Sequence, residues 1–563
     1  MRGNVIRWLF DSRLGPPGRL APRWIFLRAL AAIYFSAFYS LLFQIKGLIG
    51  PEGIQPAQSY LAAVAQSFAG ARFWFAPTLF WFSARSPMLM AVMWIGLAAS
   101  VVAFLNLWPR LSFFICFVCY LSFVAAAGEF ANYQSDGMLL EAGFLALFFA
   151  PPGVRPGWGA DHPASRASLF LLQWEWFRIY FESGMVKLLS GDPEWRGLTA
   201  MEQYYQNGPL PTWVGWYVEH LPHWFQVATA AGTLTLELGI VWMFFFPRRV
   251  RLLCFCIVTP WEIGVILTAN YTFLNYLVLS LGFLLLDDKA LLGFVPERFR
   301  PRALKSAPSP EPRLELREEP PLFILAVPEP SAAEADSGTA PAADANSRGS
   351  GRRRFTAGLS VARLALAAVL LSWIGYDTTA ELIGISLRGV PLPTAPIAAL
   401  APFRIANQYG LFAVMTRGRY EIEFQGSNDG ENWTPYPFRY KPQAVNEPPR
   451  IYAPYQPRFD WNLWFASLGS WRDDDLVPLT EERLLVNDAD VLALFRSNPF
   501  PQSPPRYVRA VLWQYWFTPM DEKRRIGDWW RRQLMGLYAP ELMLGPDGSF
   551  NVVEWPTQLP PHD

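Results

Sequence analysis

The chain has 563 residues, of which 52% are hydrophobic, 16% aromatic and only 17% charged. Soluble domains carry about 25% charged residues, so this shortage of charge, together with 25 tryptophans, predicts a protein that lies partly in lipid. The net charge is +1, which leaves no electrostatic basis for a nucleic-acid partner.

Residues 1–24 carry five arginines but neither a short apolar core nor a small-residue cleavage site. This pattern predicts a basic cytoplasmic tail that is retained, and it is not typical of a signal peptide. The four cysteines are Cys116, Cys119, Cys254 and Cys256, and all lie in apolar segments. We therefore expect no disulfide in the soluble part of the chain.

Nine segments, with one more or fewer also possible, are apolar enough to predict a helical membrane bundle, since about 20 residues cross a bilayer. The segment at 138–149 is too short to cross alone and carries Glu141, so we expect it to begin in a cavity lined by protein. The predicted spans are Ile25–Phe43, Met88–Leu107, Leu111–Ala127, Met138–Phe149, Leu169–Leu189, Phe225–Phe246, Leu252–Thr268, Tyr271–Leu286 and Phe355–Tyr376.

The basic residues predict how these spans are oriented. With the N-terminus inside, the tail and the short inside loops hold eleven arginines, whereas the short outside loops hold Lys46, Arg72, Arg85 and Arg196. Such a bias follows the positive-inside rule and places the C-terminal domain outside the cytoplasm. We expect a bacterial inner membrane, or the endoplasmic reticulum membrane in a eukaryote. The eleven are Arg2, Arg7, Arg13, Arg19, Arg23, Arg110, Arg155, Arg166, Arg248, Arg249 and Arg251.

Composition divides the remaining chain. The bundle is predicted to occupy residues 25–296, and residues 297–354, rich in Pro, Ala, Ser and Arg, are predicted to be a disordered cytoplasmic linker. A last span at 355–376 then leads to an exported domain at 377–563. Residues 53–86 are aromatic but broken by Pro and Gly, which favours helices at the membrane surface.

The exported domain has the alternation of β-strands. Residues 419–425 alternate, an Asn-Asp-Gly turn follows, and alternation resumes at 436–440, which predicts a hairpin. Residues 506–517 predict another strand. We expect a mostly β, sandwich-like domain with short helices at 488–496 and 528–537. Arg458 and Asp460 lie among many aromatic residues, so we expect them to be buried, paired and structural.

Ionisable residues within spans are costly, so each is a candidate functional residue. Glu175, Arg178 and Glu182 are three and four residues apart and share one helical face, while Lys187 lies about 140° around the helix from Glu182. These residues either lock helices together or line a polar cavity. Lys187 either reaches the membrane surface, pairs with Glu129, Asp136 or Glu182, or acts as a neutral base.

A second polar set lies at the same outer side, and two further glutamates lie in the sixth and seventh spans. We name Lys187, Glu182 and Asp136 as candidates for catalysis. The candidate cavity residues are Glu129, Gln134, Glu141, Glu175, Arg178, Glu237 and Glu262.

The other motifs in the sequence do not predict a redox, metal-binding or hydrolytic site. Cys116 and Cys119 form a CxxC in the middle of an apolar helix, where packing explains them best. His220 and His223 are separated by a proline and lack a third ligand, so we expect no metal site. The chain has no Walker loop, GxSxG elbow or HExxH, and nothing predicts that it is itself a lipase.

Several long stretches resemble lipase maturation factors. These are "FRIYFESGMVKLLSGDPEWRGLTAMEQYYQNGPLPTW", "NYTFLNYLVLSLGFLLLDD" and "FRIANQYGLFAVMTRGRYEIEFQGSNDGENWTPYPFRYKP", followed by "RFDWNLWFASL" and "NPFPQSPPRYVRAVLWQYWFT". The resemblance covers most of the chain except the linker. It implies a membrane-embedded factor whose animal members help secreted lipases to fold in the endoplasmic reticulum. The Arg-, Ala- and Pro-rich composition is typical of bacteria, so the exported client need not be a lipase.

A more distant likeness joins "SGMVKLLSGDPEW" to the vitamin K-dependent gamma-glutamyl carboxylases, in which a lysine three residues after a glycine serves as the base on the quinol. Gly184 and Lys187 occupy those positions. Two hypotheses follow. The chain is a folding factor whose exported domain binds a client protein, or it is a membrane enzyme that acts on a bound lipid or quinone through Lys187. We favour the first.

Overall fold

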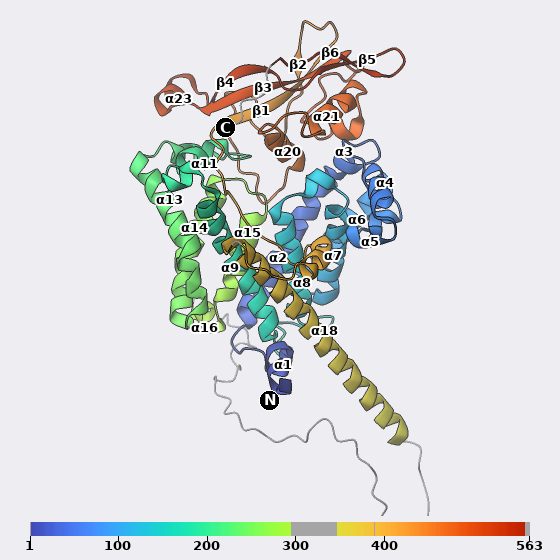
Figure 1. The fold of residues 1–563 in the computed structure, drawn as a ribbon, viewed down its shortest axis with the longest axis vertical. Helices are drawn as coiled ribbons and strands as arrows, with labels where there is room; N and C mark the ends of the chain where they lie inside the picture. Colours follow the sequence, from blue (N-terminus) through green and yellow to red (C-terminus); the bar gives the residue numbers. More distant parts are fainter. Residues whose placement is uncertain (1, 294–345, 388, 558–563) are drawn as a thin grey trace, which may run out of the picture.

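The structure is a computed structural model that describes residues 2–293, 346–387 and 389–557. A bundle of helices forms the body of the molecule, and a β-sheet built from the C-terminal residues covers one end of it (Figure 1). Most of the predicted linker at 297–354 lies outside the described residues, and the helix α18 begins at Asn346.

A helix lies at the position of each predicted span. Among the described residues, five stretches are long and apolar enough to cross a membrane: Leu20–Leu42, Ser86–Phe104, His223–Phe245, Arg248–Thr268 and Val361–Ser386. The protein is therefore an integral membrane protein, and the number of crossings beyond these five stays a prediction. The helices are α2 Leu20–Leu42, α6 Ser86–Phe104, α7 Pro109–Val124, α8 Gln134–Phe149, α9 Arg166–Ser190, α13 His223–Leu238 with η5 Ile240–Phe245, α14 Arg248–Thr268, α15 Leu274–Gly282 and α18 Asn346–Ser386.

Helices α8 and α9 form the interior of the bundle. The charged residues Glu141, Glu175, Arg178 and Glu182 on these two helices are each exposed by 1% or less. Because charged groups cannot face lipid at low cost, α8 and α9 are surrounded by other helices of the protein. Both are therefore central elements that position any site in the bundle.

Helix α1 (Arg2–Phe10) lies at the end of the bundle opposite the sheet (Figure 1), and arginine side chains cap the ends of several bundle helices. Arg23 donates to the carbonyl of Phe149 at 2.8 Å, and Arg251 donates to the carbonyl of Leu285 at 2.9 Å. Arg110 likewise donates to the carbonyl of Ala150, the residue that follows the end of α8. These side chains satisfy carbonyls that a helix C-terminus leaves without partners.

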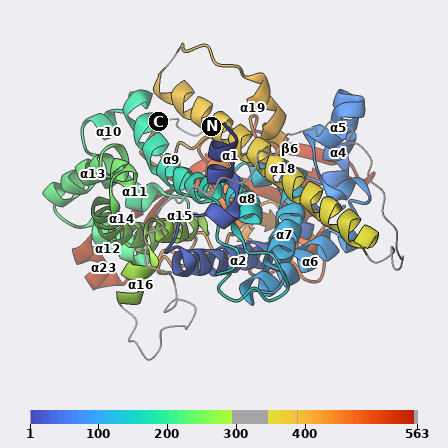
Figure 2. The same ribbon diagram turned by 90° about the horizontal axis from the view of Figure 1, so that it is seen from below.

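Short helices flank the bundle on its two sides (Figure 2). On one side lie α4 and α5. The side chains of Phe73, Trp74 and Phe82, in and after these helices, are 56%, 52% and 83% exposed. This fits the surface helices predicted for residues 53–86, whose contact with lipid stays a prediction. The short helices are α4 Ala57–Phe68 and α5 Arg72–Phe75 on this side, and α10 Pro193–Arg196, α11 Met201–Asn207 and α12 Trp213–Glu219 on the other.

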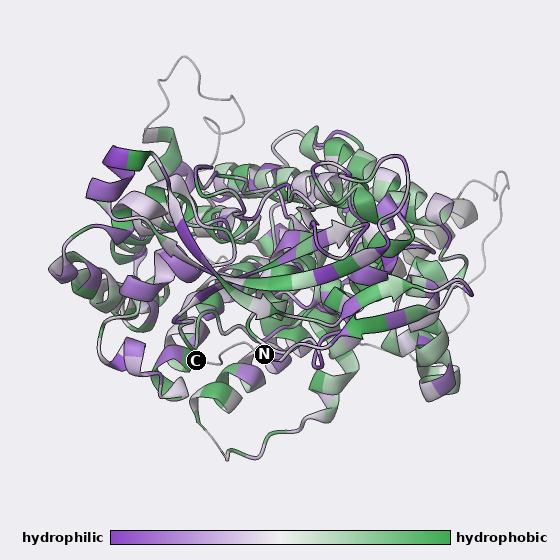
Figure 3. Ribbon diagram, turned by 90° about the horizontal axis from the view of Figure 1, so that it is seen from above, coloured by the Kyte–Doolittle hydropathy of each residue, from purple (hydrophilic) through white to green (hydrophobic). Residues whose placement is uncertain are grey.

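The C-terminal strands form one six-stranded antiparallel sheet, seen face-on in Figure 3. Its order is β2-β1-β3-β5-β6, with β4 also paired to β3. The longest pairing joins β1 and β3, in register from Arg419 opposite Tyr515 to Ser427 opposite Tyr507. The strands are β1 Arg419–Ser427, β2 Thr434–Pro435, β3 Tyr507–Phe517, β4 Trp530–Leu537, β5 Glu541–Leu544 and β6 Phe550–Glu554.

The sheet corrects several sequence-based expectations. Within residues 389–557 we find no second sheet, so the predicted sandwich is replaced by one sheet packed on the helices α20 (Arg458–Ala466) and α21 (Leu476–Leu485). The helix predicted at 528–537 is the strand β4, because Trp530 to Leu537 pair with β3. The predicted strand at 436–440 is absent, and the predicted helix at 488–496 shrinks to α22 (Ala489–Leu492).

Candidate functional site

The polar residues of the bundle surround an irregular stretch of chain. Residues 404–417, here called the connecting segment, run from the short helices α19 (Ala395–Leu400) and η8 (Ala401–Phe403) to β1 without forming a helix or strand. Irregular backbone at membrane depth is tolerated only where protein or water satisfies its polar groups. The side chains around this segment show how that is done.

Glu141 and Arg178 bind the connecting segment at Asn407. The two form a buried ion pair between α8 and α9. Arg178 also donates to the carbonyl of Asn407 at 2.6 Å, and Glu141 accepts the backbone N–H of Asn407 at 3.1 Å. The predicted charged face of α9 therefore does lock helices together, and it locks the connecting segment with them.

Glu182 and Gln134 bind the next residues in the same way. Glu182 accepts the backbone N–H of Tyr409 at 2.6 Å, and the Tyr409 hydroxyl donates to Glu141 at 2.8 Å. The side-chain amide of Gln134 both accepts from the Gly410 N–H at 3.0 Å and donates to its carbonyl at 3.3 Å. These candidate site residues thus have groups of the connecting segment as their hydrogen-bond partners.

Glu175 is the exception on this face. It is 0% exposed, and neither of its carboxylate oxygens has a hydrogen-bond partner among the described residues. The ladder expected from its spacing is therefore incomplete, since Arg178 is shared by Glu141 and Glu182.

Asp136, a candidate for catalysis, is an anchor for the sheet domain. Arg458 of α20 holds both Asp136 oxygens at 2.8 Å, and Tyr120 donates to the same carboxylate at 2.6 Å. Burial lowers the pKa of Arg458 while the Asp136 charge raises it, and the net pKa lies above the ordinary value. Arg458 is buried and paired, as its aromatic surroundings predict.

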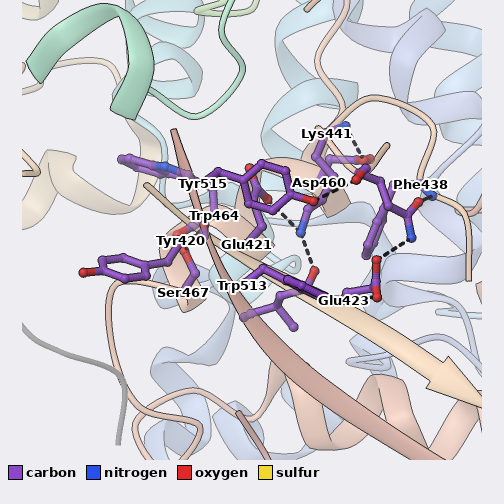
Figure 4. A network of polar contacts seen from close by, with 12 residues as sticks. Tyr420, Glu421, Glu423, Phe438, Lys441, Asp460, Trp464, Ser467, Trp513 and Tyr515 are labelled. Atoms are coloured by element: carbon purple, nitrogen blue, oxygen red, sulfur yellow. Dashed lines mark hydrogen bonds and ion pairs between the residues drawn. The ribbon is translucent and has the colours of Figure 1, made fainter. Parts of the chain in front are cut away.

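A second polar network lies beneath the sheet (Figure 4). Lys441 is within 2.9 Å of Glu421 and also donates to the carbonyl of Ile422 on the same strand. Asp460 accepts the backbone N–H groups of Tyr440 at 3.3 Å and Lys441 at 3.2 Å. Burial raises the pKa of Asp460 to about 6. These contacts fasten α20 and residues 440–441 to β1.

Glu129 stands apart from the other candidates. It lies in the short helix η4 (Gly128–Ala131) at the outer surface, where Gln55 donates to it at 3.2 Å. Partial burial, with the charge of Asp474 adding to it, raises the pKa of Glu129 to about 7. It therefore belongs to the surface between the bundle and the sheet domain and not to the polar interior.

Lys187 pairs with Glu237, which was not among its expected partners. The ammonium nitrogen lies 2.8 Å from both oxygens of Glu237, and the two residues are 2% and 4% exposed. Gly184, one turn earlier, allows α13 to approach, because a Cβ atom there would lie 2.9 Å from the Glu237 Cβ. The Gly184–Lys187 spacing is thus explained by helix packing and a buried ion pair.

The Lys187–Glu237 pair lines a cavity of about 410 Å³ between α9, α13, α14 and α15. Glu262 of α14 also lines it and accepts a hydrogen bond from Tyr180 at 2.5 Å. The structure therefore brings Lys187, Glu237 and Glu262 together. Asp136, Glu141, Arg178, Glu182 and Gln134 belong to the anchoring contacts, and neither these residues nor Glu175 line the cavity.

Some residues of these sites gave no signal in the sequence. Asn270 accepts the N–H of Tyr452 at 2.7 Å and donates to the carbonyl of Arg450 at 2.7 Å, which ties the sheet domain to the end of α14. Asn407 and Tyr409 likewise look like ordinary loop residues until the fold places them in the bundle. Within the described ranges, no group of three or more His, Cys, Asp or Glu side chains could hold a metal ion.

Comparison with known families covers both parts of the chain. A model described as the lipase maturation factor transmembrane domain matches residues 21–293. A model described as the lipase maturation factor C-terminal domain matches residues 405–540. Lipase maturation factor 2 of Homo sapiens is 31% identical over 602 residues, which cover 94% of this chain and 83% of the relative.

The chain belongs to the lipase maturation factor family. Lipase maturation factor 2 of Gallus gallus is 32% identical over 94% of this chain and 82% of its own length. Lipase maturation factor 1 of Bos taurus is 30% identical over 97% of this chain and 94% of its own. No solved structure matches. Neither family model describes a carboxylase, so the likeness to carboxylases gains no support.

Proposed function

We propose that this protein is a membrane-embedded maturation factor that helps exported proteins, lipases among them, to reach their active fold. The observation that carries the proposal is the match of both lipase maturation factor models, in order, on a chain that also aligns over 94% of its length with a relative of that name. A client protein and the surrounding lipids are the partners this implies.

The way the two parts are joined supports this role. The Arg458–Asp136 ion pair and the connecting segment hold the sheet domain against the bundle at several buried points. A client that binds the sheet domain is thereby kept next to the membrane. This is a suitable place for a factor that acts on a chain emerging from a membrane channel.

The sheet also offers a place for an unfolded client. All five residues of β6 are exposed, and among the described residues this strand pairs only with β5; it contains Phe550, Val552 and Val553. Edge strands of this kind accept an extended segment of another chain. We infer that an extended, apolar segment of the incompletely folded client pairs with β6.

We further propose that the sheet domain lies outside the cytoplasm. Helix α1, which carries Arg7, lies at the end of the bundle opposite the sheet (Figure 1), which is the arrangement expected when that end faces the cytoplasm. A reporter active only in the exported compartment, fused after the last residue, should give signal. Signal from a reporter that works only in the cytoplasm would contradict the orientation.

The test of the maturation role is capture of a client during folding. A photo-crosslinking amino acid is placed at Val553 on β6 of the full-length protein, and an exported lipase is pulse-labelled in the same cells. Crosslinks should form with newly made lipase and decline during the chase as the lipase folds. The same amino acid at Trp8, an exposed residue of α1 at the opposite end, is the control. Equal crosslinking at both positions, or none at Val553, would contradict the proposal.

A further inference from the structure

The cavity beside Lys187 is of a size that holds a ligand. Its volume of about 410 Å³ falls in the range of roughly 300–1,000 Å³ that is usual for small-molecule sites. Side chains of α9, α13, α14 and α15 line it, together with residues of α11 and α12 and Phe412 of the connecting segment.

The walls of the cavity are mainly apolar. Phe225, Thr229 and Thr233 of α13 face it at intervals of four residues. The hydroxyl of Thr229 donates to the carbonyl of Phe225 at 2.8 Å, and that of Thr233 donates to the carbonyl of Thr229 at 2.9 Å. Because these hydroxyls are occupied by their own helix, this wall offers hydrocarbon surface to a ligand.

Besides the Tyr271 hydroxyl, two polar atoms at the cavity lack hydrogen-bond partners among the described residues. The Oε1 atom of Glu262 and the Nδ2 atom of Asn275 are buried and make no hydrogen bond with any described residue. The two residues are 3% and 6% exposed, and both line the cavity. Buried polar groups normally have partners, so one unused acceptor and one unused donor at the same cavity point to a ligand that supplies both.

The charges at the cavity restrict the head group of that ligand. Among the lining residues the ionisable side chains other than tyrosines are Lys187, Glu237 and Glu262. Both oxygens of Glu237 already bind the Lys187 ammonium group at 2.8 Å. No cation at the cavity is left to pair with a carboxylate or a phosphate, and a buried charge without a partner is costly. A hydroxyl group, which both donates and accepts, matches the two free atoms.

The cavity also has space next to the surface that faces lipid. Gly264 of α14 lines it, and a Cβ atom at Gly264 would meet no heavy atom within 4 Å. Its neighbours Ile263 and Leu267 are 43% and 45% exposed, as expected for residues that face hydrocarbon. A lipid chain could therefore lie at Gly264 without displacing protein atoms.

We propose that this cavity binds one neutral lipid whose head group carries a hydroxyl, such as an acylglycerol or an isoprenoid alcohol. The hydroxyl donates to Glu262 and accepts from Asn275, and the hydrocarbon chain lies along α13 and α14 by Gly264. This site is separate from the proposed client contact at β6, so its failure leaves the maturation role untouched.

The test measures lipid binding to the full-length protein purified in detergent, by native mass spectrometry. The probes are monooleoylglycerol, geranylgeraniol, oleic acid and dioleoylphosphatidylglycerol. One molecule of a neutral alcohol should bind saturably, and the two anionic lipids should bind at least about tenfold more weakly, because burying their charge without a cation is costly. Tighter binding of monooleoylglycerol or of geranylgeraniol shows whether the ligand is an acylglycerol or an isoprenoid alcohol.

Two glycines provide a matched pair of variants. Gly264→Leu fills open space at the cavity, whereas Gly232→Leu fills open space on α13 away from it, and a Cβ at either position meets no atom within 4 Å. Gly264→Leu should abolish saturable binding, and Gly232→Leu should leave it unchanged. Glu262→Leu should weaken binding of the alcohol by about tenfold or more. Equal binding by both glycine variants, or oleic acid binding as tightly as the alcohols, would overturn the proposal.

Discussion

Arg458 of the sheet domain and Asp136 of the bundle form a buried, two-point ion pair, with each Asp136 oxygen 2.8 Å from a guanidinium nitrogen. The two residues are separated by 322 positions in the sequence, and their side chains are 0% and 1% exposed. A buried charge persists only when it is paired, so this contact fixes how the sheet domain sits on the membrane part.

Breaking this pair should destabilise the protein strongly. Arg458→Met leaves the Asp136 carboxylate buried without its cation, which should cost about 3–5 kcal/mol in the free energy of unfolding. The double variant Arg458→Met/Asp136→Leu should recover much of that loss. The control is Arg496→Gln, which breaks the exposed Arg496–Glu447 pair and should cost about 0–1 kcal/mol. Thermal unfolding of the full-length protein in detergent measures these losses. Equal melting temperatures for Arg458→Met and Arg496→Gln would contradict the anchoring role.

The connecting segment should depend on the Tyr409 hydroxyl. Tyr409→Phe removes a buried hydrogen bond to Glu141, so we expect a loss of about 1–3 kcal/mol. Tyr376→Phe is the matched control, because the Tyr376 hydroxyl also donates a hydrogen bond, to the carbonyl of Pro393, but that bond is exposed. Limited proteolysis near residues 404–417 should become faster in Tyr409→Phe and stay unchanged in Tyr376→Phe. The same rate in both would show that the hydroxyl does not hold the segment.

Lys187 should behave as half of an ion pair. Lys187→Met leaves Glu237 buried and unpaired and should destabilise the bundle by about 3–5 kcal/mol, whereas Lys187→Met/Glu237→Leu should melt near the wild type. The double variant should also keep its maturation activity. A double variant that folds normally but does not mature its client would instead establish a chemical role for Lys187.

Asp460 should make stability depend on pH. Burial raises its pKa from 3.8 to about 6, so its stabilising contribution is complete below pH 3.8 and is lost as the pH rises through about 6. Asp460→Asn keeps an oxygen acceptor for the N–H groups of Tyr440 and Lys441 but cannot ionise. Relative to this variant, the wild-type melting temperature should fall as the pH rises from about 4 to 7. A difference that stays constant over this range would show that Asp460 does not titrate there.

Local patterns predicted much of the fold. Apolar segments of about 20 residues located the helices at the predicted spans, and strict alternation located β1 and β3, since both signals depend only on nearby residues. The strand β4 escaped prediction because Trp530 to Leu537 are fixed by pairing with β3, which lies outside any local window. The single sheet was missed for the same reason: α20 and α21 provide its second layer, and neither was predicted.

The candidate site could be predicted only in part. Spacing along α9 correctly placed Glu175, Arg178 and Glu182 on one face, but it carries no information on what faces them. The partner of Lys187 comes from α13, and the partners of Glu182 and Gln134 are backbone groups near Tyr409. Such contacts join residues 50 to 276 positions apart and become visible only once the fold is known.

The most direct measurement is the activity of a secreted lipase per molecule, in cells that lack their own maturation factor. The full chain is expressed beside the lipase, and both lipase mass and lipase activity are measured in the medium. The proposed function predicts that the chain raises the activity per lipase molecule severalfold, and that the unpaired variant Arg458→Met does not. Equal specific activity with and without the chain would contradict it.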